Sequence, residues 1–176
     1  MNVSYINPFI TATTNVFKTV LDCDIRRERL SLKQTSAPSF EVSGVIGLTG
    51  KACGAVVLSV SLPVAFKLVE AMLEVQIHEI SSDAVDAVGE LTNMIAGGAK
   101  TGLSHYELSI GLPTVFTGRS RSIGFPANVR PLCILFETPW GPMAVEVGLE
   151  ESAPAGPHCQ SLSACHSLPS FQETCS

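Results

Sequence analysis

Residues 81–103 read SSDAVDAVGELTNMIAGGAKTGL, and this stretch has the spacing of one long amphipathic helix. Polar or side-chain-free positions recur at alternating steps of three and four residues, which places them on one stripe of a helix. They are Asp83, Asp86, Glu90, Asn93, Gly97 and Lys100. Apolar positions follow the same rhythm on the opposite side, at Ala84, Val88, Leu91, Ile95 and Ala99. The helix is therefore expected to bury one face and to present Glu90 and Asn93 side by side on the other.

The segments on either side of this helix alternate between helix and strand periods. Further helices are expected over residues 7–21 and 62–74, the second with Ser61 as its cap and Pro63 at an early position. Strands are expected over 29–33, 40–48, 52–60, 108–117, 132–137 and 143–149. Turns at 49–51 and 138–142 join four of these strands into two hairpins. The pattern predicts an α+β domain with a mixed, largely antiparallel sheet packed against two long helices.

The composition favours one domain followed by a tail. The chain has 176 residues, of which 45% are hydrophobic, and this is enough for a core. After Glu150 the sequence becomes rich in Ser, Pro and Cys and contains no Lys or Arg. Such a segment buries too little apolar surface to offset the conformational entropy that it would lose on ordering. We therefore expect a domain over residues 1–150 and a disordered tail over 151–176.

Charge and hydropathy argue against several classes of protein. The net charge of −5 lacks the basic footprint that nucleic-acid binding requires. No apolar stretch reaches the roughly 20 residues of a membrane span, so no membrane partner is expected. The N-terminus has no basic segment before its apolar one, so no secretory signal is expected and the cytoplasm is the expected location. The cysteines are expected to be free thiols, and the Cys and His spacings match no zinc pattern, so no metal site is expected.

Glu90 and Asn93 carry the chemistry of a candidate site. A Glu on a helix surface can bind a cation on a partner, and an Asn one turn away can hold a water molecule in a chosen direction. Phosphoryl hydrolysis needs little more from a protein than an in-line water and charge balance. The spacing by itself is weak evidence, because a polar stripe on a helix is usually only a solvated face. Gly97 and Gly98 either let another surface approach Asn93 or mark close packing inside the domain.

The same helix resembles the signature helix of the CheC/CheX/FliY family of chemotaxis phosphatases, over DAVDAVGELTNMIAGGAK at residues 83–100. Supporting stretches are NPF at 7–9, VSGVIGLTG at 42–50, GLPT at 111–114 and WGPMAVEVGL at 140–149. The similarity covers about residues 3–149, and the tail after Glu150 departs from the family pattern. The chain is most similar to CheX-type members, because it has one Glu-x-x-Asn pair where CheC-like members generally carry two.

This resemblance implies hydrolysis of the aspartyl phosphate of a phosphorylated CheY-type response regulator. It implies that Glu90 pairs with the regulator's lysine and that Asn93 orients the attacking water. Asp86, Gly97 and Lys100, on the same stripe, are expected partner contacts. No cofactor is expected in this chain, because magnesium in that family belongs to the regulator, and a homodimer formed through the sheets is implied as well. The alternative is a non-catalytic dimeric module that binds a response regulator or a sensor protein.

Overall fold

The computed structural model describes residues 5–119, 122–127 and 129–151. The helices in this part of the chain are α1 (Ile6–Leu21), α2 (Leu62–Leu73) and α3 (Ser82–Thr101). The strands are β1 (Arg26–Leu32), β2 (Val42–Thr49), β3 (Ala52–Val60), β4 (Ser109–Ile110), β5 (Thr114–Thr117), β6 (Leu132–Thr138) and β7 (Gly141–Glu151). A short 3₁₀ helix, η1 (Ser104–Tyr106), connects α3 to β4.

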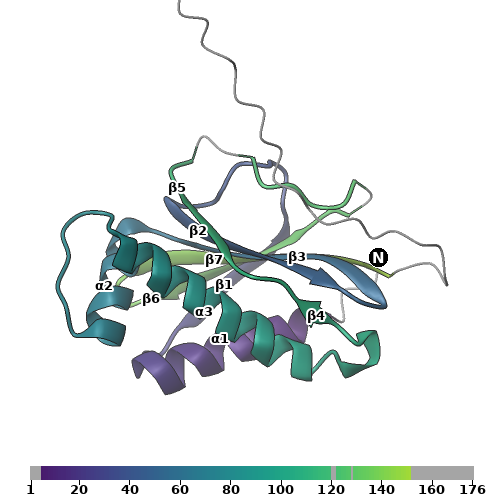
Figure 1. Cartoon of the computed structure of the whole chain (residues 1–176), viewed down its shortest axis with the longest axis horizontal. Helices are drawn as coiled ribbons and strands as arrows, with labels where there is room; N and C mark the ends of the chain where they lie inside the picture. Colours follow the sequence, from purple (N-terminus) through teal and green to yellow (C-terminus); the bar gives the residue numbers. More distant parts are fainter. Residues whose placement is uncertain (1–4, 120–121, 128, 152–176) are drawn as a thin grey trace, which may run out of the picture.

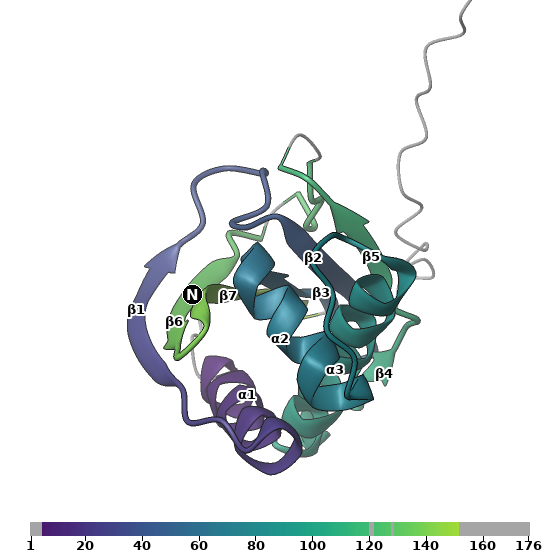
Figure 2. The same cartoon turned by 90° about the vertical axis from the view of Figure 1, so that its left-hand side faces the viewer.

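The strands form one antiparallel sheet in the order β1-β6-β7-β3-β2-β4, and β5 also pairs with β2. Both predicted hairpins, β2–β3 and β6–β7, are present, and the pairing of β7 with β3 joins them at the centre. The helices lie on one face of this sheet, with α3 near β2 and β4 and with α1 toward β6 and β1 (Figures 1 and 2). The α+β fold predicted from the sequence is therefore confirmed.

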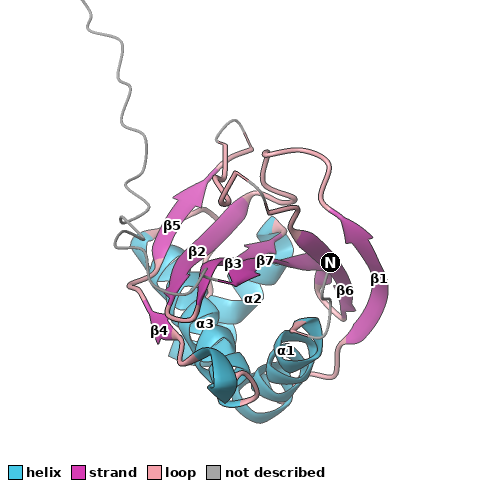
Figure 3. Ribbon diagram, turned by 90° about the vertical axis from the view of Figure 1, so that its right-hand side faces the viewer, coloured by secondary structure: helices cyan, strands magenta, loops and turns pink. Residues whose placement is uncertain are grey.

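The main core lies between the helices and the sheet face that they cover. Met143, Val145 and Val147 of β7 alternate toward this core and are fully buried, as the period of a strand predicts. Phe9 and Phe17 of α1 fill it from the other side. Strand β1 lies at the outer edge of the sheet, away from this core (Figure 3). All residues of β1 are exposed. The core is thus built on the central strands, and one long edge strand is left uncovered.

Irregular segments, and not helices, cover part of the opposite face of the sheet. Gly148 of β7 lies so close beneath Phe125 and Val129 that a Cβ atom at this position would come within 2.8 Å of each side chain. Ala144 and Glu146, on the same face of β7 as Gly148, are also fully buried. Strand β7 is therefore buried on both faces. One face of β7 packs against the main core, and the other face, which includes Glu146, lies under the irregular segments.

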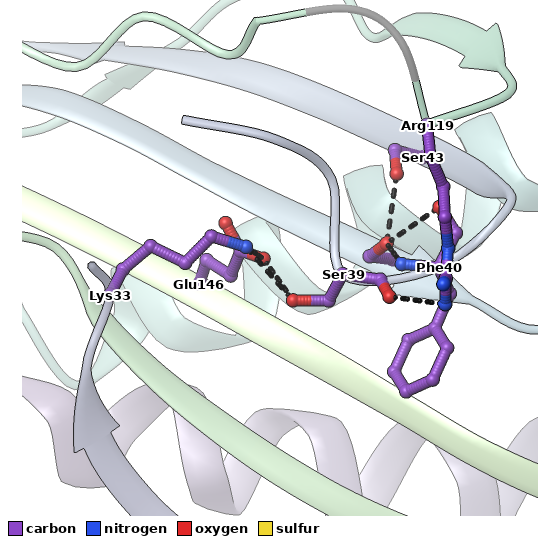
Figure 4. A network of polar contacts seen from close by, with 7 residues as sticks. Lys33, Ser39, Phe40, Ser43, Arg119 and Glu146 are labelled. Atoms are coloured by element: carbon purple, nitrogen blue, oxygen red, sulfur yellow. Dashed lines mark hydrogen bonds and ion pairs between the residues drawn. The ribbon is translucent and has the colours of Figure 1, made fainter. Parts of the chain in front are cut away.

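A polar network holds the loop between β1 and β2 on this second face (Figure 4). Lys33, directly after β1, forms an ion pair with Glu146, and the Ser39 hydroxyl donates a hydrogen bond of 2.7 Å to the same carboxylate. The side chain of Lys33 is only 10% exposed and that of Glu146 is 0% exposed. Arg119 donates to the Ser39 carbonyl at 2.8 Å, and its guanidinium lies 5.8 Å from the centre of the Phe40 ring.

One local prediction is wrong, and a second is confirmed in position only. The strand expected over 108–117 is divided into β4 and β5, because Pro113 has no N–H to donate to a strand ladder and the chain turns at 111–113. Ser61 is the N-cap residue of α2 and Pro63 lies in its first turn, as expected, but the Ser61 hydroxyl makes no capping bond. That hydroxyl is buried without a hydrogen-bond partner among the residues that the structure describes.

The end of the domain also differs slightly from the prediction. Strand β7 continues to Glu151, where the Tyr106 hydroxyl donates a hydrogen bond of 2.9 Å to the carboxylate. The remainder of the predicted tail, residues 152–176, lies outside the described residues. Within residues 5–151, apart from the positions left undescribed, no helix has the length and apolar character needed to cross a bilayer.

Candidate functional site on helix α3

Helix α3 has the two faces that its sequence predicts. The apolar positions of the pattern are all buried: Ala84, Val88, Leu91, Ile95 and Ala99. The opposite positions form a surface that we call the α3 stripe: Asp83, Asp86, Glu90, Asn93, Gly97 and Lys100. Glu90 and Asn93 are exposed, one helical turn apart, so their side chains are neighbours on the outer surface of one helix. The structure therefore brings together the pair that the sequence singles out.

Close packing against two strands fixes the rotation of α3 about its axis. Gly44 of β2 lies beneath Thr92, and a Cβ atom at Gly44 would come 2.2 Å from the Thr92 hydroxyl oxygen. That hydroxyl donates to the carbonyl of Val88 at 2.6 Å, so it is satisfied although it is buried. Gly89 faces β5, where a Cβ atom would lie 3.3 Å from a Val115 methyl group. With these faces held against the sheet, the α3 stripe has to point outward.

The two adjacent glycines of α3 have different surroundings. A Cβ atom added at Gly98 would lie 3.0 Å from the Cβ of Ala12, so Gly98 allows α1 and α3 to approach each other closely. A Cβ atom added at Gly97 would have no neighbouring atom within 4 Å. Of the two explanations that the sequence left open, close packing inside the domain applies to Gly98, and approach of another surface stays a prediction for Gly97. Gly98 serves packing inside the domain, whereas Gly97 leaves open space beside Asn93.

The side chains of the α3 stripe are unpaired within the described part of the chain. Neither the Glu90 nor the Asn93 side chain has a hydrogen bond or ion pair there, although Lys67 and Glu70 pair on the neighbouring helix α2. Of the charged members of the stripe, the acidic ones lie in the first half of the helix and Lys100 lies in the last turn. This distribution matches the helix dipole and makes the surface around Glu90 negative. A carboxylate and an amide are thus available to a partner with a complementary cation.

This arrangement has the character of a docking surface. The stripe occupies the outer side of a helix, which is convex. Asp86, Glu90, Asn93 and Lys100 are exposed, whereas Asp83 and Gly97 are partly buried. A pocket of about 420 Å³ lies elsewhere, between α2 and the β6–β7 turn, with Phe66, Lys67 and Trp140 among its lining residues. None of its lining residues belongs to the α3 stripe. Chemistry at Glu90 and Asn93 therefore requires a partner that supplies the rest of the site.

The sequence did not indicate that the turn between β4 and β5 packs against α3. Leu112 lies in the turn between β4 and β5, and Pro113 faces Gly89 on the side of α3 that leads to Asn93. The sequence contained one signal for it, since Gly-Leu-Pro is a poor continuation of a strand. That signal was missed because the segment 108–117 was interpreted as continuous.

The sequence matches the family described as "Chemotaxis phosphatase CheX" over residues 42–137, more than half of the chain, including all of α3. The chain belongs to the CheX family. A curated relative, the CheY-P phosphatase CheX of Thermotoga maritima, is 29% identical over 126 residues, which cover 70% of this chain and 81% of the relative. The resemblance inferred from the helix motif is therefore confirmed.

Solved structures agree with this assignment to the CheX family. A CheC-like superfamily protein from Shewanella sp. PV-4 is 30% identical, with a TM-score of 0.77 over 85% of this chain and 99% of that chain. The CheX of Borrelia burgdorferi, solved in a complex with CheY, BeF3 and Mg, is 21% identical. Its TM-score is 0.70 over 85% of this chain and 100% of that chain, which shows a shared fold.

Proposed function

We propose that this protein hydrolyses the aspartyl phosphate of a CheY-type response regulator and that Glu90 and Asn93 carry the reaction. The observation that supports this most is the exposure of both side chains, unpaired and one turn apart, on a helix held rigidly against its sheet. Membership of the CheX family and the phosphatase activity in the name of the Thermotoga maritima relative support the same activity. The exposed position of Glu90 and Asn93 on the outer side of a helix fits a protein substrate.

In this proposal the two side chains have separate tasks. The Glu90 carboxylate pairs with the regulator's lysine and holds the phosphorylated aspartate against α3. The Asn93 amide donates to and accepts from a water molecule and aligns it with the phosphorus. Water oxygen then forms the new bond to phosphorus, the bond to the aspartate oxygen breaks, and a carboxylate and inorganic phosphate are released. Only the alignment of water is specific to the transition state, so Asn93 determines the rate.

The remaining members of the α3 stripe are proposed partner contacts. Asp86 adds negative charge one turn before Glu90, and Lys100 adds a positive charge at the far end of the stripe. Gly97 leaves the space that a regulator loop needs for close approach. Magnesium is proposed to enter with the regulator, and the Borrelia burgdorferi complex, which contains CheY and Mg, supports that arrangement.

We also propose a homodimer in which a second copy covers strand β1. This strand is the outermost one at its edge of the sheet and is exposed over its whole length. Leu30 and Leu32 on β1 are each 42% exposed and lie on the same face. Exposed edge strands with apolar side chains are usually covered in natural proteins, because they otherwise pair with other chains.

Phosphate release from a phosphorylated CheY-type receiver domain tests the proposed reaction. The receiver is phosphorylated in the presence of Mg²⁺, and phosphate release is followed with and without a catalytic amount of this protein. We expect faster release with the parent protein and release at the receiver's own rate with Asn93→Ala. Equal acceleration by the parent and by Asn93→Ala would exclude the proposed chemistry. Binding of the receiver without any acceleration would instead favour the non-catalytic module.

A further inference from the structure

The Glu90 carboxylate is exposed on the outer side of α3, and this position limits how strongly it can bind a lysine. Ion pairs between exposed side chains gain little net free energy, because water solvates both charges and salt screens them. The attraction becomes stronger when neighbouring apolar atoms exclude water from the pair. A lysine contact at Glu90 would therefore gain most from an apolar neighbour on the same surface.

The residues one helical turn from Glu90 include one such neighbour. They are Asp86 and Ala87 before it and Asn93 and Met94 after it. Asp86 and Asn93 are polar, and Ala87 is buried. Met94 is apolar and only partly buried, so part of its side chain reaches the surface of α3.

The geometry of a helix places the Met94 side chain between the core and Glu90. Long side chains on a helix lean toward its N-terminus and cover the residues three and four positions earlier. For Met94 these residues are Leu91, which is fully buried, and Glu90, which is exposed. The packing of Met94 against the main core agrees with this position. The thioether therefore lies along the border of the α3 stripe, beside Glu90.

The next turn of α3 leaves this border open. Gly98 follows Met94 by four residues, so it lies on the same side of the helix, where it meets Ala12 of α1. Gly97 follows Met94 by three residues, and a Cβ atom added there would have no neighbouring atom within 4 Å. Neither glycine has a side chain that could cover Met94. A partner that approaches Glu90 would therefore contact Met94 as well.

We propose that Met94 is the apolar contact that excludes water from the ion pair between Glu90 and the lysine of the receiver domain. This inference rests on the proposed function, and it gives Met94 a role in docking that the hydrolysis itself does not require. Burial of the thioether contributes affinity directly, and the removal of water strengthens the attraction between the charges beside it. The flexible side chain of methionine also adapts to an irregular partner surface. Met94 is thus a positioning residue that acts through Glu90, whereas Asn93 acts on the water molecule.

Titration calorimetry with a CheY-type receiver domain activated by beryllofluoride and Mg²⁺ tests this proposal. Met94→Gln keeps the length of the side chain but makes it polar, and it should weaken binding by about tenfold. Met94→Leu keeps the apolar character and should bind within about threefold of the parent. Met72→Gln is the matched control, because Met72 on α2 is also partly buried against the main core but lies outside the α3 stripe. Met72→Gln should bind like the parent.

A double-variant cycle separates shielding of the ion pair from an independent apolar contact. When Glu90→Gln has already removed the charge, the further change Met94→Gln should weaken binding by clearly less than it does in the parent. Equal weakening in both backgrounds would overturn the shielding role. Parent-like binding by Met94→Gln would also overturn it and would leave the proposed phosphatase intact.

Kinetics and thermal unfolding give separate readouts. Met94→Gln should raise KM for the phosphorylated receiver and leave kcat unchanged, whereas a fall in kcat with KM unchanged would overturn the docking role. Met94→Gln and Met72→Gln each place an amide at a partly buried position and should lower the melting temperature by similar amounts. A loss of binding by Met94→Gln alone would therefore not be a loss of folding.

The methionine methyl groups give a readout that needs no change at the docking surface. In protein with isotope-labelled methionine methyl groups, the Met94 signal, assigned from the spectrum of Met94→Leu, should shift when the activated receiver is added. The signal of Met143, which is fully buried in β7, should not shift. An unchanged Met94 signal with the receiver bound would overturn the contact. A parent protein that neither binds nor dephosphorylates the receiver would overturn the proposed function and this inference together.

Discussion

Glu90 and Asn93 are neighbours on one helix, and the proposed reaction predicts different defects when each is removed. Asn93→Ala should bind the phosphorylated regulator like the parent but lower kcat by about 10²-fold or more, as expected when a contact specific to the transition state is lost. Glu90→Ala should weaken binding as well as the rate, because the regulator's lysine loses its counter-charge. Titration of each variant with phosphorylated regulator, with kcat and KM fitted separately, measures both effects.

Two further variants at Glu90 separate charge from shape. Glu90→Gln keeps the size of the side chain and should behave like Glu90→Ala if charge is what matters. Glu90→Lys should bind more weakly still, because it opposes like charges at the docking point. All of these side chains are exposed, so melting temperatures should stay close to the parent value. Binding of Glu90→Lys at parent strength would contradict the lysine pairing.

The buried ion pair between Lys33 and Glu146 predicts an asymmetric effect on stability. Lys33→Met leaves a carboxylate without its cation in a fully buried position, which should cost about 3–5 kcal/mol of unfolding free energy. The double variant Lys33→Met, Glu146→Leu removes both charges and should recover much of this loss. Urea denaturation of the parent and the two variants tests this. If the double variant were no more stable than Lys33→Met, the lost contacts of the Lys33 side chain, and not the unpaired charge of Glu146, would account for the loss of stability.

At the scale of the element, the two glycines of α3 predict opposite effects of the same substitution. Gly97→Ala adds a methyl group where there is open space and should stabilise the protein by up to about 1 kcal/mol, the difference in helix propensity. Gly98→Ala gains the same propensity but brings two Cβ atoms to 3.0 Å, so α1 has to shift and core packing is strained. Thermal or urea unfolding should therefore rank Gly97→Ala above Gly98→Ala. The reverse order would contradict the assigned environments.

Gly97 also predicts an effect on binding that is independent of stability. A leucine at Gly97 would fill the space beside Asn93 without meeting another atom of the described domain at its Cβ. Gly97→Leu should therefore fold like the parent but bind the beryllofluoride-activated receiver more weakly. Lys67→Leu on α2 is a suitable control, since it changes an exposed residue outside the stripe. Equal binding by Gly97→Leu and the parent would remove Gly97 from the proposed interface.

The periodicity of the sequence predicted the helices and strands of this fold better than it predicted which residues pack against them. The rhythm of α3 was sufficient to place Glu90 and Asn93 outward, because the same steps of three and four residues buried Val88 and Leu91. The glycine pair could not be assigned from sequence, since its two roles depend on whether Ala12 lies opposite. The burial of Glu146 was equally inaccessible, because it depends on loop segments that reach the sheet from distant parts of the chain.

At the scale of the whole molecule, the exposed strand β1 predicts self-association. Multi-angle light scattering at micromolar concentration should give the mass of a dimer. Leu30→Asp with Leu32→Asp places two charges on the face that a second copy is proposed to cover, and this variant should shift toward the monomer mass. Its dephosphorylation rate per chain should stay near the parent value, because the α3 stripe lies toward the opposite edge of the sheet (Figure 2). A parent protein of monomer mass would contradict the dimer.

The open position of the α3 stripe has a consequence for selectivity. Small ligands are usually bound in concave sites that surround most of their surface, and the convex outer side of a helix does not surround a ligand in this way. Free phosphorylated metabolites would therefore pass this surface without being retained, however abundant they are in the cell. Discrimination would rest on a folded protein fitting the helix, so this hydrolase would need no gate or lid to protect the cell's other phosphate esters. The same shape makes the stripe a poor target for an inhibitor of drug size.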